Sequence, residues 1–253
     1  MKKIEVVSTT KTQRAIFIIV LSIMIIGFIY SFVNIFIAPI DYEEGVTLIK
    51  NDYILRASQT IGGIVLLFLP SFLEKKWNFK IPSMMHIFVF LFLFAAIMLG
   101  EYARFHFRVP GFDKVLHILS SAFFASLSFT VIHVLNYHEI FKLRPLFVAI
   151  FAFTFSMTIA VFWEFYEFSW DYFANLNMLK YMDSAGNEFS GLSAIYDTMG
   201  DLFVATIGAG VISIIGYFAI KYEKTWIYKF IIRRKKVKSL SDDTLENTDK
   251  NNI

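Results

Sequence analysis

Long runs of apolar residues, broken by short polar stretches, dominate the pattern along this 253-residue chain. A helix needs about 20 apolar residues to cross a hydrocarbon core of about 30 Å, and six segments are long enough. These segments cover residues 15–37, 54–72, 82–100, 115–135, 146–168 and 194–220. The pattern therefore predicts an all-α, polytopic membrane protein with six transmembrane helices.

Composition supports this prediction and excludes several classes of protein. Hydrophobic residues make up 57% of the chain and charged residues 18%, whereas soluble domains carry about 25% charge. The apolar content also excludes a largely disordered chain. Because there is no cysteine, the chain has no disulfide, thiolate metal site, cysteine nucleophile or lipoprotein anchor.

The distribution of Lys and Arg predicts how the chain is oriented. The first segment is too long for a signal-peptide core and lacks a small-residue cleavage site, so we interpret it as a retained anchor. The N-terminus, loops 73–82 and 136–145, and the C-terminal tail hold 18 of the 24 cations. The remaining loops and helix ends hold 6 cations and 13 of the 21 acids. Since cations gather on the inner side of a membrane, both termini are predicted to be cytoplasmic.

The chain then divides into four parts: a cytoplasmic N-terminus (1–14), a six-helix membrane domain (15–220), a basic juxtamembrane helix (221–238) and a disordered cytoplasmic tail (239–253). Residues 221–238 carry eight cations interleaved with aromatic and aliphatic residues. That pattern is typical of a segment held at an anionic leaflet. We expect membrane lipids as partners, with anionic lipid at the tail and no nucleic acid. The oligomeric state stays open.

Acidic residues gather at the predicted outer ends of four helices. The group contains seven carboxylates and one imidazole: Glu101, Asp113, His117, Glu164, Glu167, Asp171, Asp197 and Asp201. Spacings of three or four residues place the members from one helix on one face. The sequence therefore predicts one ionisable site in the outer third of the bilayer.

Each member also has a simpler interpretation. Asp113 and Asp197 could favour the positive ends of helix dipoles, and Asp171 could be an interfacial loop acid. Glu164 and Asp201 resist this account, because each lies more than a turn inside its span, where an ionisable group is costly. Structural ion pairs are an alternative for these acids, and the candidate partners are Arg56, Arg104, Arg108 and Lys114. His106, on an outer loop, is uninformative alone.

Three short motifs in order resemble the YjdF-like bacterial inner-membrane family, a domain of unknown function. They are Asp113-Lys114-Val-Leu-His117, Trp163-Glu164-Phe-Tyr-Glu167 and Asp197-Thr-Met-Gly-Asp201 with Gly208 downstream. The first and last also resemble VanZ-like membrane proteins linked to teicoplanin resistance, in which Asn is frequent where this chain has Ala205. The resemblance covers residues 95–220. It implies a multi-pass protein of the bacterial inner membrane and transfers no activity.

The favoured hypothesis is that the site binds a divalent cation on the outer side of the membrane. The protein would then be a metal-dependent enzyme that acts on a phosphorylated lipid or envelope precursor. Carboxylates suit Mg²⁺, Mn²⁺ or Ca²⁺, and an imidazole also admits Zn²⁺. The candidate metal ligands are Asp113, His117, Glu164, Glu167, Asp197 and Asp201. The candidate catalytic groups are His117, Glu164 and Asp201, and Arg104 and Arg108 are the candidate phosphate-binding residues. His117 is the expected proton carrier, because imidazole ordinarily titrates near neutrality.

Two alternatives stay open, so the sequence does not decide whether the protein is an enzyme. A proton- or cation-coupled transporter could use Glu164, Asp197 and Asp201 as coupling groups. Against it, the halves show no clear internal repeat, and no Gly/Pro-broken helix lies at the midplane. The third interpretation is a non-catalytic scaffold or resistance factor whose charges fix helix packing.

Overall fold

The computed structural model describes residues 10–40, 48–76, 79–136, 142–183, 186–223 and 233–234, and these residues are almost entirely helical. In chain order the elements are α1 (Lys11–Asn34), α2 (Lys50–Lys76), β1 (Phe79–Lys80), α3 (Ser83–Leu93), η1 (Phe94–Tyr102), α4 (Phe105–Arg108), α5 (Phe112–Leu135), α6 (Pro145–Ala174), α7 (Leu192–Lys221) and β2 (Arg233–Arg234). The predicted all-α class is confirmed. Six helices are long and apolar enough to cross a membrane, with α3 and η1 together forming the third.

Local sequence explains where several of these helices begin. The side chain of Thr10 caps α1 by accepting a hydrogen bond from the Gln13 amide at 3.1 Å. Pro145 opens α6, at a position where its missing N–H is not needed. α7 begins at Leu192, two residues before the predicted start. Asp197 therefore lies in its second turn, and a helix-end explanation fits Asp113 better than Asp197.

The third span changes from α-helix to π-helix halfway. η1 runs for nine residues, and the Ala103 amide that follows it donates to the Met98 carbonyl, five residues back, at 3.0 Å. π-helical segments occur often at functional sites. This one ends at Glu101 and Tyr102, where the span reaches the acidic end of the molecule.

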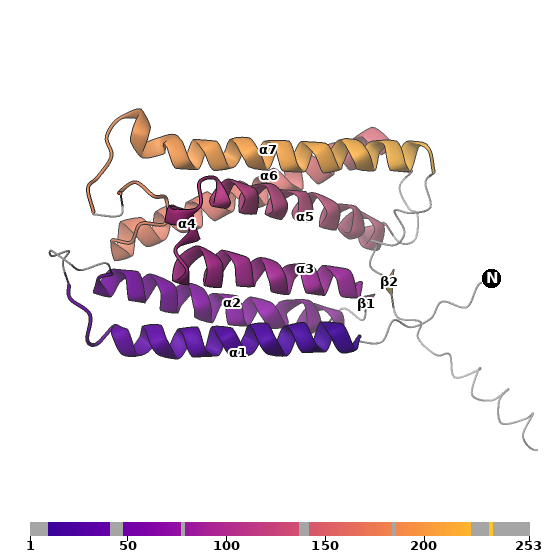
Figure 1. The fold of residues 1–253 in the computed structure, drawn as a ribbon. Helices are drawn as coiled ribbons and strands as arrows, with labels where there is room; N and C mark the ends of the chain where they lie inside the picture. Colours follow the sequence, from indigo (N-terminus) through magenta and orange to yellow (C-terminus); the bar gives the residue numbers. More distant parts are fainter. Residues whose placement is uncertain are drawn as a thin grey trace, which may run out of the picture.

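The spans form two groups of three (Figure 1). The N-terminal unit contains α1, α2, α3 and η1, and the C-terminal unit contains α5, α6 and α7. The short helix α4 connects them. Within each unit the helices lie against one another over much of their length. The units touch where η1 and α4 meet α5, and where Leu55 of α2 packs against Leu176 and Met178.

The basic tail lies largely outside the described residues. Of the predicted juxtamembrane helix 221–238, Lys221 ends α7 and Arg233–Arg234 form β2, which pairs antiparallel with β1. The short strand differs from the helix expected at those two positions, because backbone pairing with Phe79–Lys80 takes its place. The predicted tail 239–253 and residues 1–9 also lie outside the described part of the chain.

Candidate functional site

One end of the molecule carries a continuous chain of ionisable side chains. It is drawn from η1, α4, α5, α7 and the connection between α6 and α7, which meet at the left of Figure 1. In order of contact its members are Glu101, His106, Asp113, Lys180, Asp197, Lys114, Asp201 and His117. We call these eight residues the ionic network.

The deepest part of the network lies between α5 and α7. Lys114 Nζ lies 2.7 Å from Asp197 Oδ1 and 2.9 Å from Asp201 Oδ1. His117 Nε2 lies 3.6 Å from the same Asp201 oxygen. Asp201 is only 2% exposed. The one-turn spacing of Asp197 and Asp201 thus lets one lysine contact both carboxylates.

Lys180 reaches the network from the connection between α6 and α7. Its Nζ lies 2.6 Å from Asp113 Oδ2 and 3.3 Å from Asp197 Oδ2. Burial lowers the pKa of Lys180, but the Asp113 and Asp197 carboxylates outweigh burial and raise that pKa above its ordinary value. The ammonium group therefore stays charged between the two acids.

His106 joins the two units of the fold. Its Nε2 lies 3.6 Å from Glu101 Oε1 on η1, and its Nδ1 lies 3.2 Å from Asp113 Oδ1 on α5. The ring rests on Gly100, where an added Cβ would lie 2.3 Å from His106 Nε2. A glycine at this position is what allows the imidazole to fit between the two carboxylates.

Glu164 and Glu167 on α6 lie beside the network rather than in it. Glu164 is 6% exposed, and neither of its oxygens has a hydrogen-bond partner of good geometry among the described residues. Thr198, Asp197 and Lys114 are its polar neighbours. Glu167 instead accepts a hydrogen bond from Trp163 Nε1 at 2.8 Å.

Asp171 has a structural role that the sequence did not indicate. It was expected to be an interfacial loop acid, yet it is 7% exposed. Its carboxylate accepts hydrogen bonds from the Met178 and Leu179 amides at 2.7 and 2.8 Å. Asp171 therefore holds the segment that carries Lys180.

The three candidate arginines lie in different surroundings. Arg104 lies over the ring of Phe107, with 5.4 Å between its Cζ and the ring centroid, and Arg108 is exposed. Arg56 is 5% exposed and donates to the Glu101 carbonyl at 2.8 Å, with its guanidinium against Tyr53 and Tyr102.

Of the candidate ligands, three converge closely enough to hold one metal ion. Asp113, His117 and Asp201 each offer a ligand atom, and these atoms lie within 4.8 Å of one another. Asp201 Oδ1 contacts Lys114 and His117 without a hydrogen bond of good geometry. Two carboxylates and an imidazole suit Mn²⁺ or Zn²⁺. Asp197, Glu164 and Glu167 lie outside this group of three.

Lys180 and His106 are the members of the network that the sequence interpretation missed. A usable signal existed for Lys180, because it is the sole cation between Arg144 and Lys221 in the sequence. Such an isolated cation next to a group of acids is a natural counter-ion. For His106 the linear sequence offers no comparable signal, since its two partners lie on different helices.

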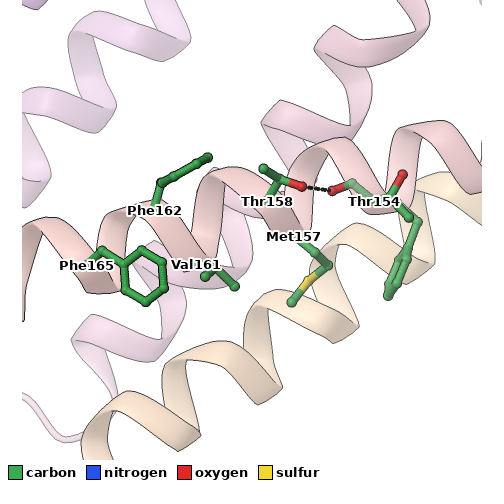
Figure 2. Close-up of a pocket in the computed structure, with 7 residues that line it drawn as sticks. Thr154, Met157, Thr158, Val161, Phe162 and Phe165 are labelled. Carbon is green, nitrogen blue, oxygen red and sulfur yellow. Dashed lines mark hydrogen bonds between the residues drawn. The ribbon is translucent and has the colours of Figure 1, made fainter.

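A shallow apolar groove of about 350 Å³ lies along α6 (Figure 2). Its lining residues are Phe153, Thr154, Met157, Thr158, Val161, Phe162 and Phe165. All come from one helix, and Thr154 and Thr158 bond within that helix. The groove is therefore part of the apolar outer surface and supplies no group for chemistry.

Comparison with known proteins gives one match. Residues 20–222 match a family described as "Predicted membrane protein (DUF2238)". No curated protein and no solved structure matches the chain. The match agrees with the expected resemblance to an uncharacterised membrane family. It does not extend to VanZ-like proteins.

Proposed function

The chain belongs to the DUF2238 family of predicted membrane proteins, and we propose that it binds a divalent cation through Asp113, His117 and Asp201. We further propose that this site faces the outside of the bacterial inner membrane, with both termini in the cytoplasm. The basic segment after α7 would then contact anionic lipid on the opposite side.

The observation that carries the proposal is the convergence of three ligand atoms within 4.8 Å. Asp113 and His117 come from successive turns of α5, and Asp201 comes from α7. Preorganised ligands on rigid helices bind an ion without the cost of ordering a loop. Asp201 supports the site further, because it is buried and its Oδ1 lies 3.6 Å from Nε2 of His117, another proposed ligand.

We extend the proposal to hydrolysis or transfer at a phosphate-bearing lipid. A divalent ion at this depth can polarise a phosphoryl oxygen, and His117 is placed to move a proton beside it. Glu164, buried near Asp197 and Lys114, is a second candidate acid or base. The phosphate-binding role expected of Arg104 and Arg108 remains part of this proposal.

Packing below the site favours a one-sided site over coupled transport. A Cβ added at Gly208 of α7 would lie 2.5 Å from the Ile118 carbonyl and 2.3 Å from Ser121 Oγ of α5. The two helices therefore touch within two turns of Asp201. Passage of an ion between α5 and α7 would require them to separate.

A structural lock is the second candidate function, and one observation favours it. Lys114 and Lys180 already pair three aspartates of the network, so the charges can fix helix packing without a metal. In that case the protein is a scaffold whose ionic network sets the geometry of α5, α7 and their connection.

Metal content separates these functions. We expect full-length protein, purified after equilibration with Mn²⁺ or Zn²⁺ and desalted, to retain one ion per chain. Asp201→Asn should retain none while it remains monodisperse. Glu188→Gln is the control, because Glu188 is an exposed acid outside the network. Wild type without bound metal would favour the structural lock.

A further inference from the structure

The proposed cation site already contains two cations of the chain itself. Lys114 contacts Asp201, and Lys180 contacts Asp113, so each aspartate of the proposed site has a lysine within 2.9 Å. An incoming divalent ion would lie close to both ammonium groups and be repelled by them. At least one lysine therefore opposes ion binding.

The two lysines differ in how freely they can leave. Lys114 belongs to the first turn of α5, next to Asp113, and its ammonium group joins that helix to Asp197 and Asp201 of α7. Lys180 lies on the connection between α6 and α7, with a positive φ of 51° that a lysine rarely adopts. Lys180 is thus the cation whose departure would disturb the fewest helices.

The segment around Lys180 is fixed by hydrogen bonds within the C-terminal unit and by packing against the N-terminal unit. The Asp171 carboxylate accepts hydrogen bonds from the Met178 and Leu179 amides. The Asn177 side chain donates a hydrogen bond to the Met182 carbonyl at 2.9 Å and accepts one from the Met182 amide at 3.1 Å. Leu176 and Met178 are buried against Leu55 of α2. The segment therefore rests on the N-terminal unit while its lysine enters the ionic network.

We propose that Lys180 is a tethered counter-ion that determines the cation affinity of the site, and that a divalent ion displaces it and loosens residues 175–183. This inference rests on the proposed divalent-cation site. A monovalent ion only replaces the charge that Lys180 already supplies, so it gains little by displacing the lysine. A divalent ion that replaces Lys180 brings one more positive charge to the aspartates than the lysine did. The site should therefore bind divalent ions in preference to monovalent ones.

The test compares Mn²⁺ affinity of wild type with that of Lys180→Met in the full-length protein. Methionine keeps an unbranched apolar side chain and removes the charge. We expect Lys180→Met to bind Mn²⁺ about tenfold more tightly or better, because one ammonium group no longer repels the ion. Lys180→Arg keeps the charge and should bind as wild type does. Lys76→Gln removes an exposed cation at the end of α2, outside the network, and should also leave the affinity unchanged.

Hydrogen exchange gives a second readout that does not depend on affinity. Saturating Mn²⁺ should accelerate exchange of the Met178 and Leu179 amides in wild type. Lys180→Met should show faster exchange even without metal.

The outcomes separate this inference from the proposed function. If wild type binds Mn²⁺ while Lys180→Met binds it no more tightly, or while both amides stay protected, the tethered counter-ion is wrong and the cation site stands. If Lys180→Met binds Mn²⁺ and wild type does not, Lys180 blocks the site, so both its displacement by the ion and the wild-type cation site are wrong. If neither protein binds Mn²⁺, both proposals fall.

Discussion

The two units of the fold have the same number of spans but fill their interiors differently. The N-terminal unit has a core of larger apolar side chains: Val20, Met24, Leu67, Phe90, Leu93, Ile97 and Met98. Buried small or hydroxyl residues are frequent in the C-terminal unit: Ser121, Ala125, Ser128, Ala152, Ser156, Ala205, Gly208, Ala209 and Ser213. Helices with small interface residues can approach closely.

This difference explains where the charges are. Close approach of α5 and α7 brings Lys114 within ion-pair distance of two aspartates, which helices spaced by large side chains would not allow. The N-terminal unit instead buries most of its polar groups around one phenol. The Tyr102 hydroxyl donates to the Gly27 carbonyl at 2.8 Å and lies 2.7 Å from Ser31 Oγ. One unit is thus suited to scaffolding and the other to holding charge.

The ionic network is also what the two units share. Arg56 of α2 donates to the Glu101 carbonyl, and the Glu101 side chain leads through His106 to Asp113. A substitution in the network can therefore change the position of Arg56 in α2. The following experiments test how far the two units differ.

The largest effect is all-or-none and concerns the side of the membrane that the charged end faces. Reporter domains fused after Lys80 and after Arg234 should report the cytoplasm, and one fused after Gly186 should report the outside. The reason is the excess of cations at the ends opposite the network. An external signal at Arg234 would reverse the comparison, since the network would then face the cell interior.

The next effect is the loss of a shared cation inside the C-terminal unit. Lys114→Met should destabilise the protein by about 3 kcal/mol, near the lower end for breaking a buried pair, because Lys114 is partly exposed. Unfolding by a denaturing detergent measures this cost. Lys76→Met, at the exposed end of α2, should change stability by less than about 0.5 kcal/mol.

A second substitution sharpens that result. Lys114→Met combined with Asp201→Asn removes the unpaired carboxylate as well as the lysine, so the double variant should be more stable than the sum of the single costs predicts. Simple additivity would mean that Lys114 and Asp201 do not act as a pair.

The sequence predicted those parts of the site that depend on neighbouring residues in the chain. Asp201 and Glu164 were singled out by their depth in apolar segments, a local property, and both are buried. The i, i+4 spacing of Asp113 and His117 likewise predicted a shared face, and both contribute to the candidate metal group. Lys114 was recognised as one of four candidate counter-ions.

What the sequence did not predict depends on contacts between distant segments. Lys180 and Asp113 are 67 residues apart, and their contact requires the turn that Asp171 holds. His106 required Gly100, six residues earlier on η1, to make room for its ring. Glu167 and Glu164 were expected from the sequence to have the same role as metal ligands, but the Glu167 carboxylate accepts a hydrogen bond from Trp163 instead. Such contacts are set by tertiary packing, which hydropathy and spacing do not contain.

Close packing in the C-terminal unit predicts a smaller stability effect. Gly208→Ala should destabilise by about 2 kcal/mol, because its Cβ would overlap the backbone of α5. The matched control in the N-terminal unit is Gly62→Ala. A Cβ there meets nothing within 4 Å, so the substitution should stabilise α2 by about 0.5 kcal/mol or more through helix propensity. Equal effects at both positions would remove the packing difference between the units.

The smallest expected effect concerns the hydrogen bonds around the Tyr102 hydroxyl in the N-terminal unit. Tyr102→Phe removes one hydroxyl that donates to the Gly27 carbonyl and lies 2.7 Å from Ser31 Oγ and 3.1 Å from Thr60 Oγ1. The expected cost is about 1 kcal/mol, since the ring and its contacts remain and only hydrogen bonds are lost. Tyr172→Phe is the control, because Tyr172 is 69% exposed on α6 and its loss should lie within measurement error. Mn²⁺ affinity should be unchanged in both variants, because neither hydroxyl contacts the ionic network. A drop in Mn²⁺ affinity in Tyr102→Phe would show that the N-terminal unit positions the cation site through Glu101, and the division between a scaffolding unit and a charged unit would no longer hold.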